Sequence, residues 1–409
     1  MVGGKPLTIV LISDTAHHIG GQTKVTFDSA IGLKQAGHRP IVFSAVGPAD
    51  PALIAAGVEV VILGQHGMHD DPNRLAAAAR GLWNGAARAA LASFLADLPA
   101  ETIVHCHAWT KGFSAAIASA VRASGRPAVY TLHDYFLFCP NGAFFDFPAN
   151  RICRREPMSL DCWSAQCDSR SYAHKLWRCV RQVVSTRVAS MATAFSDYIC
   201  ISQFQHEAIG HRLPKGSHLH RLSNPIEATD LGVKPDAATG DIVFVGRLSP
   251  EKGALLFAEA ARRAGIVPVF VGDGPIAGEI AARFPEAKLL GWADPATVRG
   301  HMRAARALVF PSLWFEGQPL TVMEAKAMGT PVIVSDACAG REEIVDGDSG
   351  LWFSSGDVDD LARALKAVTD DDLVRRLARG AYESFWREPR DLARHVAGLE
   401  AIYREMLAR

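Results

Sequence analysis

Short apolar runs alternate with amphipathic stretches along the whole chain, and this alternation limits the possible fold more than any other feature. The first run, residues 7–13, reads LTIVLIS and is typical of a parallel strand buried on both faces. Runs of the same kind, ending in polar or glycine-rich loops, recur in both halves of the 409 residues. Strands that alternate with helical crossovers form parallel sheets covered by helices. The sequence therefore predicts an α/β protein with a parallel sheet in each half.

The length and the composition fit two domains. With 49% apolar residues, each half can bury its own core. We predict a first domain at residues 1–222, a second at 223–384, and a C-terminal helix at 385–409. The segment that begins Ser-Asn-Pro-Ile at residue 223 reads as the linker. The 43 basic and 43 acidic residues balance, which argues against nucleic acid as a partner.

No targeting or membrane-spanning segment is indicated. Gly3, Gly4, Lys5 and Pro6 run directly into the first strand, without a charged and then apolar leader. No apolar stretch approaches the ~18–20 residues that a spanning helix needs. We expect a cytoplasmic protein, and peripheral contact with the inner face of the membrane stays open.

The region 311–353, PSLWFEGQPLTVMEAKAMGTPVIVSDACAGREEIVDGDSGLWF, carries the strongest chemical signal. Glu316 lies in a Gly- and Pro-rich loop, and Glu324 lies in a short helix that Pro319 can open and Gly329 can close. A Glu pair at this spacing also occurs by chance, and a Glu near a helix start is ordinarily a solvated cap. The surrounding motifs favour a binding site instead.

The start of that short helix is suited to phosphate. Free backbone N–H groups around Leu320 and Thr321, with the partial positive charge of a helix N-terminus, attract anions. Glu324 lies about one turn further in, where its carboxylate can accept hydrogen bonds from sugar hydroxyls. The pattern indicates a sugar nucleotide.

A second cationic element lies at residues 241–253, DIVFVGRLSPEKG. A strand that delivers Arg247 and Lys252 beside a glycine-containing turn can clamp a diphosphate, because Arg binds in a fork and Lys acts as a point charge. The competing interpretation is a surface Arg followed by an ordinary helix start.

Further candidates follow other strands. Gly20 and Gly21, after the first strand, let the chain approach a ligand closely, although a simple tight turn is the alternative. His105, His107 and His133 stand near the ends of two more strands, where α/β sheets bind ligands. Each could equally be a structural histidine, and their spacing does not suit zinc.

Three motifs of region 311–353 together resemble the donor-binding signature of retaining glycosyltransferases of family four: Pro-Ser-x3-Glu-Gly, Glu-Ala-x-Ala-x-Gly-x-Pro-Val and Asp-Gly-x-x-Gly. This resemblance implies the GT-B fold, in which two Rossmann-like domains face a central cleft and the last helix returns to the first domain. It also implies a nucleoside-diphosphate sugar as donor, a glycan or lipid-linked acceptor, retention of configuration and no required cofactor or divalent metal.

The same resemblance assigns roles to the candidate residues. Arg247 and Lys252 would bind the diphosphate, Glu324 the ribose, and Glu316 and His133 would lie by the donor sugar. The implied catalytic set is Glu316, His133, Arg247 and Lys252. The implied donor-binding set is Gly20, Gly21, Arg247, Lys252, Gly317, Leu320, Thr321 and Glu324.

An insert at residues 135–190 departs from the family pattern. It holds Cys139, Cys153, Cys162, Cys167 and Cys179. Incidental buried thiols are the favoured interpretation, and a structural metal such as zinc is the alternative. A disulfide would form only in an oxidising compartment. From residue 151 to 190 the insert carries eight Lys and Arg against three Asp and Glu. Such a surface could meet an anionic lipid or a polyprenyl diphosphate acceptor, although a solvated helix face is the simpler interpretation.

Two alternatives to an active transferase remain. A catalytically silent sugar-nucleotide or glycan-binding protein could keep this scaffold, but Glu316, Glu324, Arg247 and Lys252 argue against silence. An NAD-dependent dehydrogenase would need a Gly-x-Gly-x-x-Gly fingerprint after the first strand, which is missing. The sequence leaves open the donor base and sugar, the acceptor and linkage, the role of the insert cysteines, the oligomeric state and the pathway.

Overall fold

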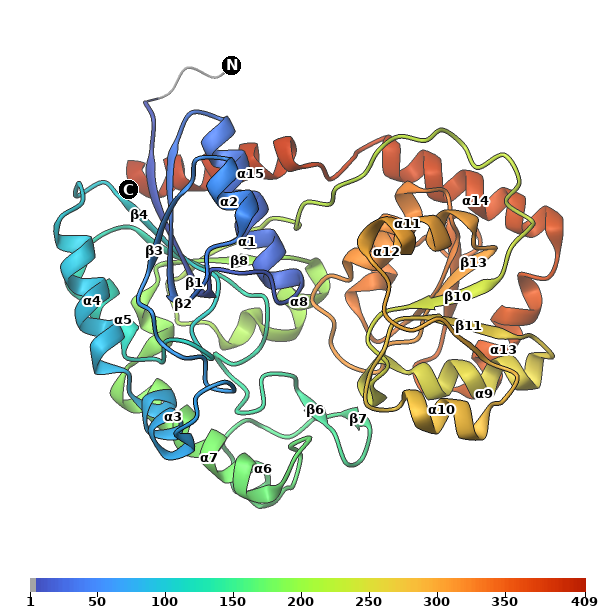
Figure 1. The fold of residues 1–409 in the computed structure, drawn as a ribbon, viewed down its shortest axis with the longest axis horizontal. Helices are drawn as coiled ribbons and strands as arrows, with labels where there is room; N and C mark the ends of the chain where they lie inside the picture. The colour runs from blue at the N-terminus through green and yellow to red at the C-terminus, as the bar shows by residue number, and fades with distance from the viewer. Residues whose placement is uncertain (1–4) are drawn as a thin grey trace.

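The protein folds into two α/β units joined by a linker and by a returning C-terminal helix (Figure 1). This computed structural model describes residues 5–409. Residues 1–4 lie outside the described residues; they include Gly3 and Gly4, on which the expectation of no leader segment partly depends.

The N-terminal domain is built on a seven-stranded sheet whose neighbouring strands are all parallel. In spatial order its strands are β3 (Glu59–Ile62), β2 (Arg39–Val46), β1 (Thr8–Thr15), β4 (Ile103–Cys106), β5 (Ala128–Thr131), β8 (Asp197–Cys200) and β9 (His218–Arg221). The central β1 is buried along nearly its whole length. This confirms the strand that the run at residues 7–13 predicts.

Helices cover both faces of this sheet, as expected of parallel strands joined by crossovers. They are α1 (Gly21–Gln35), α2 (Pro51–Ala55), α3 (Arg74–Leu82), α4 (Gly85–Ala96), α5 (Ile117–Ser124) and α8 (Gln203–Ile209), with short 3₁₀ turns at Met191–Ala194 and Gly210–Arg212.

The insert is more ordered than the loop-rich region that the sequence predicts. It contains a small hairpin of β6 (Phe145–Asp146) and β7 (Arg151–Ile152), followed by α6 (Leu160–Ser164) and α7 (Tyr172–Val183). A π-helical stretch, Val184–Val188, continues α7. The hairpin reaches toward the other domain (Figure 1), where Phe145 joins a buried cluster with Leu313.

The C-terminal domain has a six-stranded parallel sheet. Its strands in spatial order are β12 (Lys288–Leu289), β11 (Pro268–Val271), β10 (Ile242–Val245), β13 (Ala307–Phe310), β14 (Val332–Ser335) and β15 (Gly350–Phe353). Its helices are α9 (Ala254–Ala264), α10 (Ala277–Arg283), α11 (Pro295–Ala304), α12 (Leu320–Ala327), α13 (Val358–Ala367) and α14 (Asp371–Trp386), with 3₁₀ turns at Pro250–Lys252 and Ala339–Glu343.

The last helix, α15 (Leu392–Ala408), leaves the C-terminal domain and packs on the N-terminal one. It lies against α1 at Gly32, where an added Cβ would come within 2.5 Å of Val396. The hydroxyl of Tyr403 is 2.7 Å from Nδ1 of His105 on β4. The predicted return of this helix, and with it the predicted fold class, is confirmed.

Candidate active site

The loop between β13 and α12, which carries Glu316, is held by the N-terminal domain. The ring of Phe315 packs 5.4 Å from that of Phe204 and 6.5 Å from that of Tyr135. An added Cβ at Gly317 would lie 3.1 Å from Gln205 Nε2. The two domains therefore touch directly at the residues that flank Glu316.

Lys252 forms an ion pair with Glu316. Lys252 ends the 3₁₀ turn that follows β10, and its ammonium also lies 5.1 Å from the ring centre of Trp314. The next residue, Gly253, has φ of 72°, and an added Cβ there would lie 2.0 Å from the carbonyl oxygen of Pro311. This close backbone contact brings the Lys252 turn against the Glu316 loop.

The short helix α12 begins at Leu320, so Pro319 is its N-cap and not its first helical residue as predicted. The backbone N–H groups of Leu320 and Thr321 have no acceptor among the described residues. The predicted closing glycine, Gly329, follows the C-cap with a left-handed φ of 67°. The helix start is thus free to accept an anion.

The glycine loop of the N-terminal domain faces this helix start. An added Cβ at Gly21 would lie 3.8 Å from Leu320 Cδ1, and Gly20 is the N-cap of α1. The predicted glycine pair and the predicted phosphate site therefore meet across the domain boundary.

Glu324 lies one turn into α12 and is largely withdrawn from solvent. Burial raises the pKa of its carboxyl group, and the positive charge of Lys24 on α1 partly offsets that rise. A half-buried carboxylate beside the gap between the domains can accept hydrogen bonds from ligand hydroxyls.

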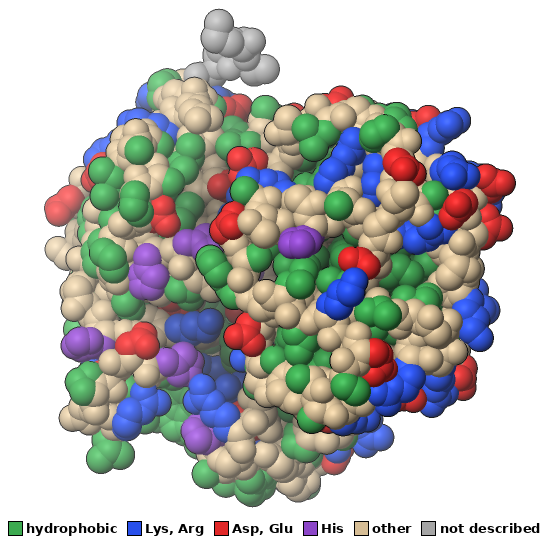
Figure 2. Space-filling model, turned by 45° about the vertical axis from the view of Figure 1, so that its right-hand side comes forward, with side chains coloured by type: hydrophobic (Ala, Val, Ile, Leu, Met, Phe, Trp, Pro, Cys, Tyr) green, Lys and Arg blue, Asp and Glu red, His purple; other side chains and the backbone are tan. Residues whose placement is uncertain are grey.

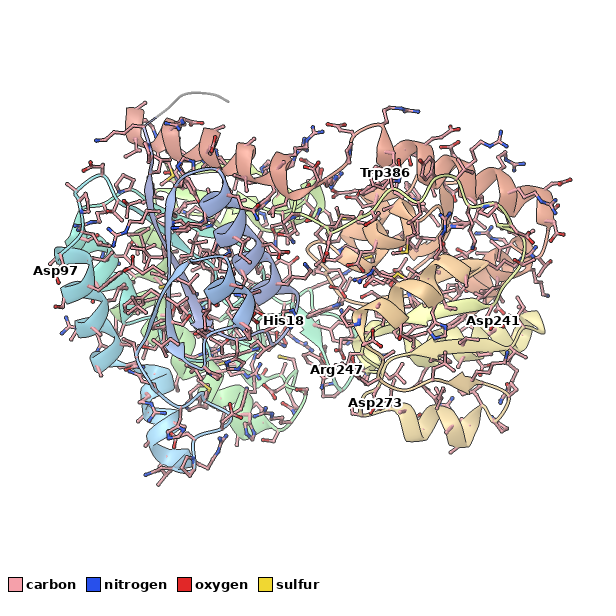
Figure 3. All side chains as sticks on the ribbon, turned by 45° about the horizontal axis from the view of Figure 1, so that its top comes forward. His18, Asp97, Asp241, Arg247, Asp273 and Trp386 are labelled. Atoms are coloured by element: carbon pink, nitrogen blue, oxygen red, sulfur yellow. The ribbon has the colours of Figure 1, made fainter. Side chains whose placement is uncertain are left out.

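Arg247 is exposed on the turn after β10. Figure 3 shows Arg247 and Asp273 at the edge of the C-terminal domain that faces the other domain, and His18 on the opposing edge. Arg247 forms no ion pair within residues 5–409, whereas Lys252 is paired with Glu316.

The strand-end histidines form one buried cluster. Nδ1 of His107 is 2.9 Å from Nε2 of His133, and the rings of His105 and His107 are 4.0 Å apart. Burial lowers the pKa of His133 to about 3, so this side chain is neutral at pH 7. A neutral His133 can position a ligand by hydrogen bonding, but it cannot act as a cationic acid there. Burial also raises the pKa of the adjacent Asp134 to about 6.

The insert cysteines surround a lysine. The ammonium of Lys175 lies 3.3 Å from Sγ of both Cys162 and Cys167, and Lys175 is fully buried. Burial alone would lower the pKa of Lys175, but the negative charge of the neighbouring cysteines in their thiolate form raises it above its usual value. All eight cysteines are free, and residues 5–409 hold no group of three or more His, Cys, Asp or Glu side chains that could bind a metal ion.

Asp346 and Asp357, each followed two positions later by a second Asp, accept local backbone hydrogen bonds. Asp357 caps α13 by accepting from the N–H groups of Asp359 and Asp360. Asp346 accepts from the N–H of Trp352 at 2.8 Å.

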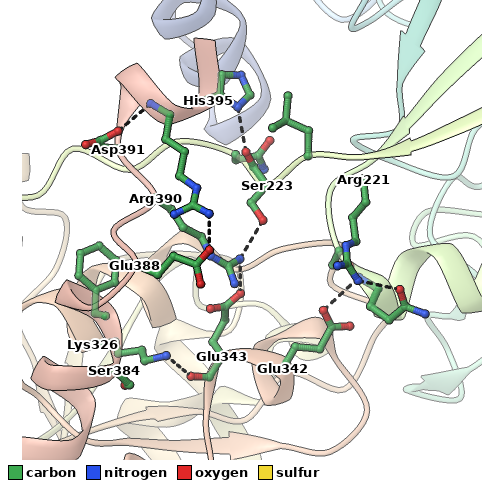
Figure 4. Close-up of a pocket in the computed structure, with 16 residues that line it drawn as sticks. Arg221, Ser223, Lys326, Glu342, Glu343, Ser384, Glu388, Arg390, Asp391 and His395 are labelled. Atoms are coloured by element: carbon green, nitrogen blue, oxygen red, sulfur yellow. Dashed lines mark hydrogen bonds and ion pairs between the residues drawn. The ribbon is translucent and has the colours of Figure 1, made fainter. Parts of the chain in front are cut away.

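A polar pocket of about 440 Å³ lies where the linker and the returning segment before α15 cross between the domains (Figure 4). Arg390 bonds there to Glu343 at 2.6 Å and to the hydroxyl of Ser223 at 2.9 Å. None of the predicted site residues lines this pocket. We interpret it as the hinge between the domains.

Sequence reasoning missed the N-terminal residues that hold the Glu316 loop. Tyr135 follows β5, and Phe204 and Gln205 are neighbours on α8; no spacing relates either segment to region 311–353. The only available signal is the aromatic pair Trp314-Phe315 immediately before Glu316, because such rings next to a polar site need partners.

Two facing α/β domains, with a lysine–glutamate pair and a free helix start at their contact, define a glycosyltransferase of the GT-B class. The model of Glycosyltransferase Family 4 matches residues 19–230, and that of Glycosyl transferases group 1 matches residues 239–371. The chain therefore belongs to glycosyltransferase family four. The predictions of the family and of an enzyme are confirmed, and the dehydrogenase alternative is removed.

Relatives and solved structures agree with this assignment. The chain is 26% identical over 298 residues to the UDP-Gal:alpha-D-GlcNAc-diphosphoundecaprenol alpha-1,3-galactosyltransferase of Escherichia coli, covering 68% of each protein. It is 26% identical over 362 residues to the glycogen synthase of Mycobacterium tuberculosis, covering 81% of this chain and 83% of that one. The structure of Anabaena HepE in complex with UDP superposes with a TM-score of 0.68 at 17% identity, over 98% of this chain and 100% of that chain.

One structural finding bears on membranes. In the part of the chain that the structure describes, no helix combines the length and apolar character needed to cross a bilayer.

Proposed function

We propose that the protein transfers a hexose from a UDP-sugar to a lipid-linked acceptor, with retention of the anomeric configuration. The name of the E. coli relative specifies UDP-galactose and an acceptor linked to diphosphoundecaprenol. HepE structures contain UDP and UDP-glucose. These relatives support the choice of donor and acceptor class.

The observation that carries the proposal is the pairing of Lys252 with Glu316 beside α12. When the anomeric C–O bond breaks, negative charge develops on the departing diphosphate. Lys252 and the free N–H groups of Leu320 and Thr321 stabilise that charge, and electrostatic stabilisation is usually a large part of catalysis. Arg247, on the same segment after β10 as Lys252, joins them when the donor is bound.

The remaining residues position the donor. Glu324 accepts hydrogen bonds from the ribose, while Glu316 and His133 contact the donor sugar from opposite domains. Gly20 and Gly21 leave room for the phosphates next to Leu320. Closure of the domains about the hinge at Arg390 excludes water and limits donor hydrolysis. The proposal assigns no divalent metal to this step.

A donor panel tests the proposal. The protein is incubated with UDP- or GDP-hexoses and with an acceptor in which a sugar is linked through a diphosphate to a short lipid chain. The released nucleotide and the glycosylated lipid are then measured. We expect one UDP-hexose to yield product. NMR should show that the anomeric carbon has the same configuration in the product as in the donor. Tight UDP binding without product from any donor would favour the silent binding protein instead.

A further inference from the structure

A cationic cavity lies in the N-terminal domain, apart from the residues assigned above. It has a volume of about 390 Å³ and lies between α3, α7 and the loops at residues 68–69 and 110–111. Its basic lining residues are Arg74, Lys111, Arg170, Arg178 and Arg181, with His69 and His174. None of its lining residues is an Asp or a Glu. In Figure 2, Lys, Arg and His side chains gather on the lower part of this domain.

The basic groups are only partly neutralised. Arg178 pairs with Asp168 at 3.0 Å, whereas Lys111 and Arg170 are exposed and form no ion pair within the described residues. The positive charges of Arg170, Lys111 and Arg74, added to burial, lower the pKa of His69. Such mutual repulsion is relieved when an anion binds among these groups.

Among the basic residues that line the cavity, Arg181 is buried. Only 6% of the residue is exposed, and its guanidinium lies 4.8 Å from the ring centre of Phe136 and 5.2 Å from that of Trp177. Its hydrogen-bond acceptor is the carbonyl of Thr110 at 3.4 Å. A guanidinium has five N–H donors, so this cation keeps bonding capacity in a cavity without carboxylates.

Trp177 supplies a second unsatisfied donor. Its indole Nε1 is buried and has no acceptor among residues 5–409. The ring lies against α3 at Gly81, where an added Cβ would come within 2.8 Å of it. A buried indole N–H normally has a partner, and a ligand oxygen is the partner that this cavity can hold.

Apart from Thr110, the rest of the lining is apolar. It consists of Met68, Ala77, Ala78, Phe136, Ala173 and the Trp177 ring. Leu75 on α3 and Tyr172 and Val180 on α7 are exposed apolar side chains of the same two helices, with exposures of 85%, 42% and 43%. A ligand that fits both the basic side and the apolar side of this cavity is an amphiphile with an anionic head.

The cavity lies beside the carboxyl edge of the N-terminal sheet. Backbone N–H groups of Lys111 and Gly112 donate to the carboxylate of Asp14, at the end of β1, at 2.9 Å and 2.8 Å. Gly112 permits this approach, since an added Cβ would lie 2.6 Å from the carbonyl oxygen of Asp14. The same edge leads to Gly20 and Gly21.

We infer that this cavity binds the diphosphate of a prenyl-linked acceptor, with the phosphate oxygens on the cations and the Trp177 N–H and the prenyl chain along the apolar wall. The inference rests on the proposed function for the identity of the acceptor. The sugar attached to the diphosphate then extends along the carboxyl edge of the sheet toward the donor. The prenyl chain leaves over Leu75 and Val180, so this face of the domain lies on the membrane.

Binding of farnesyl diphosphate to the full-length protein, measured by calorimetry without any donor, tests the site. We expect the double variant Lys111→Ser/Arg170→Ser to weaken binding at least 100-fold, since each removed cation costs about tenfold or more. Trp177→Phe, which keeps a ring but removes the N–H, weakens it several-fold. Arg187→Ser, an exposed cation on the π-helical continuation of α7 that does not line the cavity, stays within twofold.

Competitors separate the possible ligands. Inorganic pyrophosphate is expected to bind at least tenfold more weakly than farnesyl diphosphate, and farnesol not measurably. Unchanged affinity in the double variant, equal affinity for pyrophosphate, or binding only to phosphatidylglycerol vesicles overturns the inference. If farnesyl diphosphate binds as expected while no donor yields product, the proposed function fails and the site stands.

Discussion

The ammonium of Lys252 is bonded to the carboxylate of Glu316, although 64 positions separate them in the sequence. The pair joins the turn after β10 to the loop before α12, and both side chains keep some exposure to the gap between the domains. We expect a donor diphosphate at the start of α12 to compete for Lys252. Its arrival would release the Glu316 carboxylate toward the donor sugar.

Lys252→Ala should therefore lower kcat by about 100-fold or more, the usual effect of removing one group that stabilises developing charge. The fold should survive, because a partly exposed ion pair contributes only about 0–1 kcal/mol. Product formation with the preferred donor measures the first effect, and thermal unfolding the second. Glu286→Gln, which alters an exposed carboxylate of the same domain paired with Arg262, serves as the control and should leave kcat unchanged. A fully active Lys252→Ala enzyme would remove this residue from the mechanism.

Glu324→Gln should raise the KM for the donor by roughly tenfold, because hydrogen bonds to a charged acceptor contribute about 1.5–3 kcal/mol. Burial raises the pKa of Glu324. The carboxylate must be ionised to accept from two ribose hydroxyls, so donor affinity should fall on acidification, at a higher pH than for an ordinary glutamate. Donor KM measured from pH 7.5 to 5 should show this rise in the wild type and a flat, elevated profile in the variant. If the KM of the wild type and that of the variant changed with pH in the same way, Glu324 would not bind the ribose.

The sequence predicted the parts of the site that lie within one segment. The loop with Glu316, the helix with Glu324 and its closing Gly329 follow from local capping and apolar patterns. Contacts between segments, such as Phe204 against Phe315, depend on how the domains meet and leave no periodic trace. The helix α7 was missed, although Ala173, Trp177 and Val180 recur at helical spacing. The sequence does not show that the buried positions of this helix include Lys175, Arg181 and Gln182.

The buried histidines should make the native state sensitive to acid. Burial lowers the pKa values of His105 and His107 well below normal, that of His133 to about 3 and that of His395 to about 4. Below about pH 6.5 the unfolded chain binds protons that the native state does not. As the pH is lowered below about 6.5, the free energy of unfolding should therefore fall by about 1.4 kcal/mol per pH unit for each such histidine.

Asp134 has the opposite effect on stability. Burial raises its pKa to about 6, so on acidification the native state binds this proton before the unfolded chain does and is stabilised. Urea unfolding at pH 7.5 and 5.5 measures the sum. His395→Gln should reduce the difference in unfolding free energy between these two pH values by about 1.4 kcal/mol, the contribution of one histidine. His218→Gln, at an exposed position on β9, should not change it. A wild-type stability that is flat over this range would contradict the neutral cluster.

Arg390 should control domain closure. Its guanidinium bonds Glu343 of the C-terminal domain and Ser223 of the linker, and Glu343 is only 7% exposed. Arg390→Ala leaves that carboxylate without its partner, at a cost of roughly 1–3 kcal/mol. We expect a larger radius of gyration in small-angle scattering with UDP present, and a several-fold loss in kcat. Arg375→Ala, which breaks an exposed pair with Asp372 on α14, should change neither.

Gly317 allows the Glu316 loop to approach the N-terminal domain. An added Cβ would lie 3.1 Å from both Gln205 Nε2 and Ile201 Cδ1, closer than nearly all real contacts of this kind. Gly317→Ala should thus displace Glu316 or part the domains slightly, and misplacement of reacting groups by about 1 Å can cost about 100-fold in rate. Gly300→Ala on α11, where an added Cβ meets nothing within 4 Å, is the matched control. We expect kcat to fall at least tenfold in the first variant, with UDP affinity and thermal stability close to wild type. Equal activity of the two alanine variants would show that the Glu316 loop tolerates movement, and would weaken the role given to its contact with the N-terminal domain.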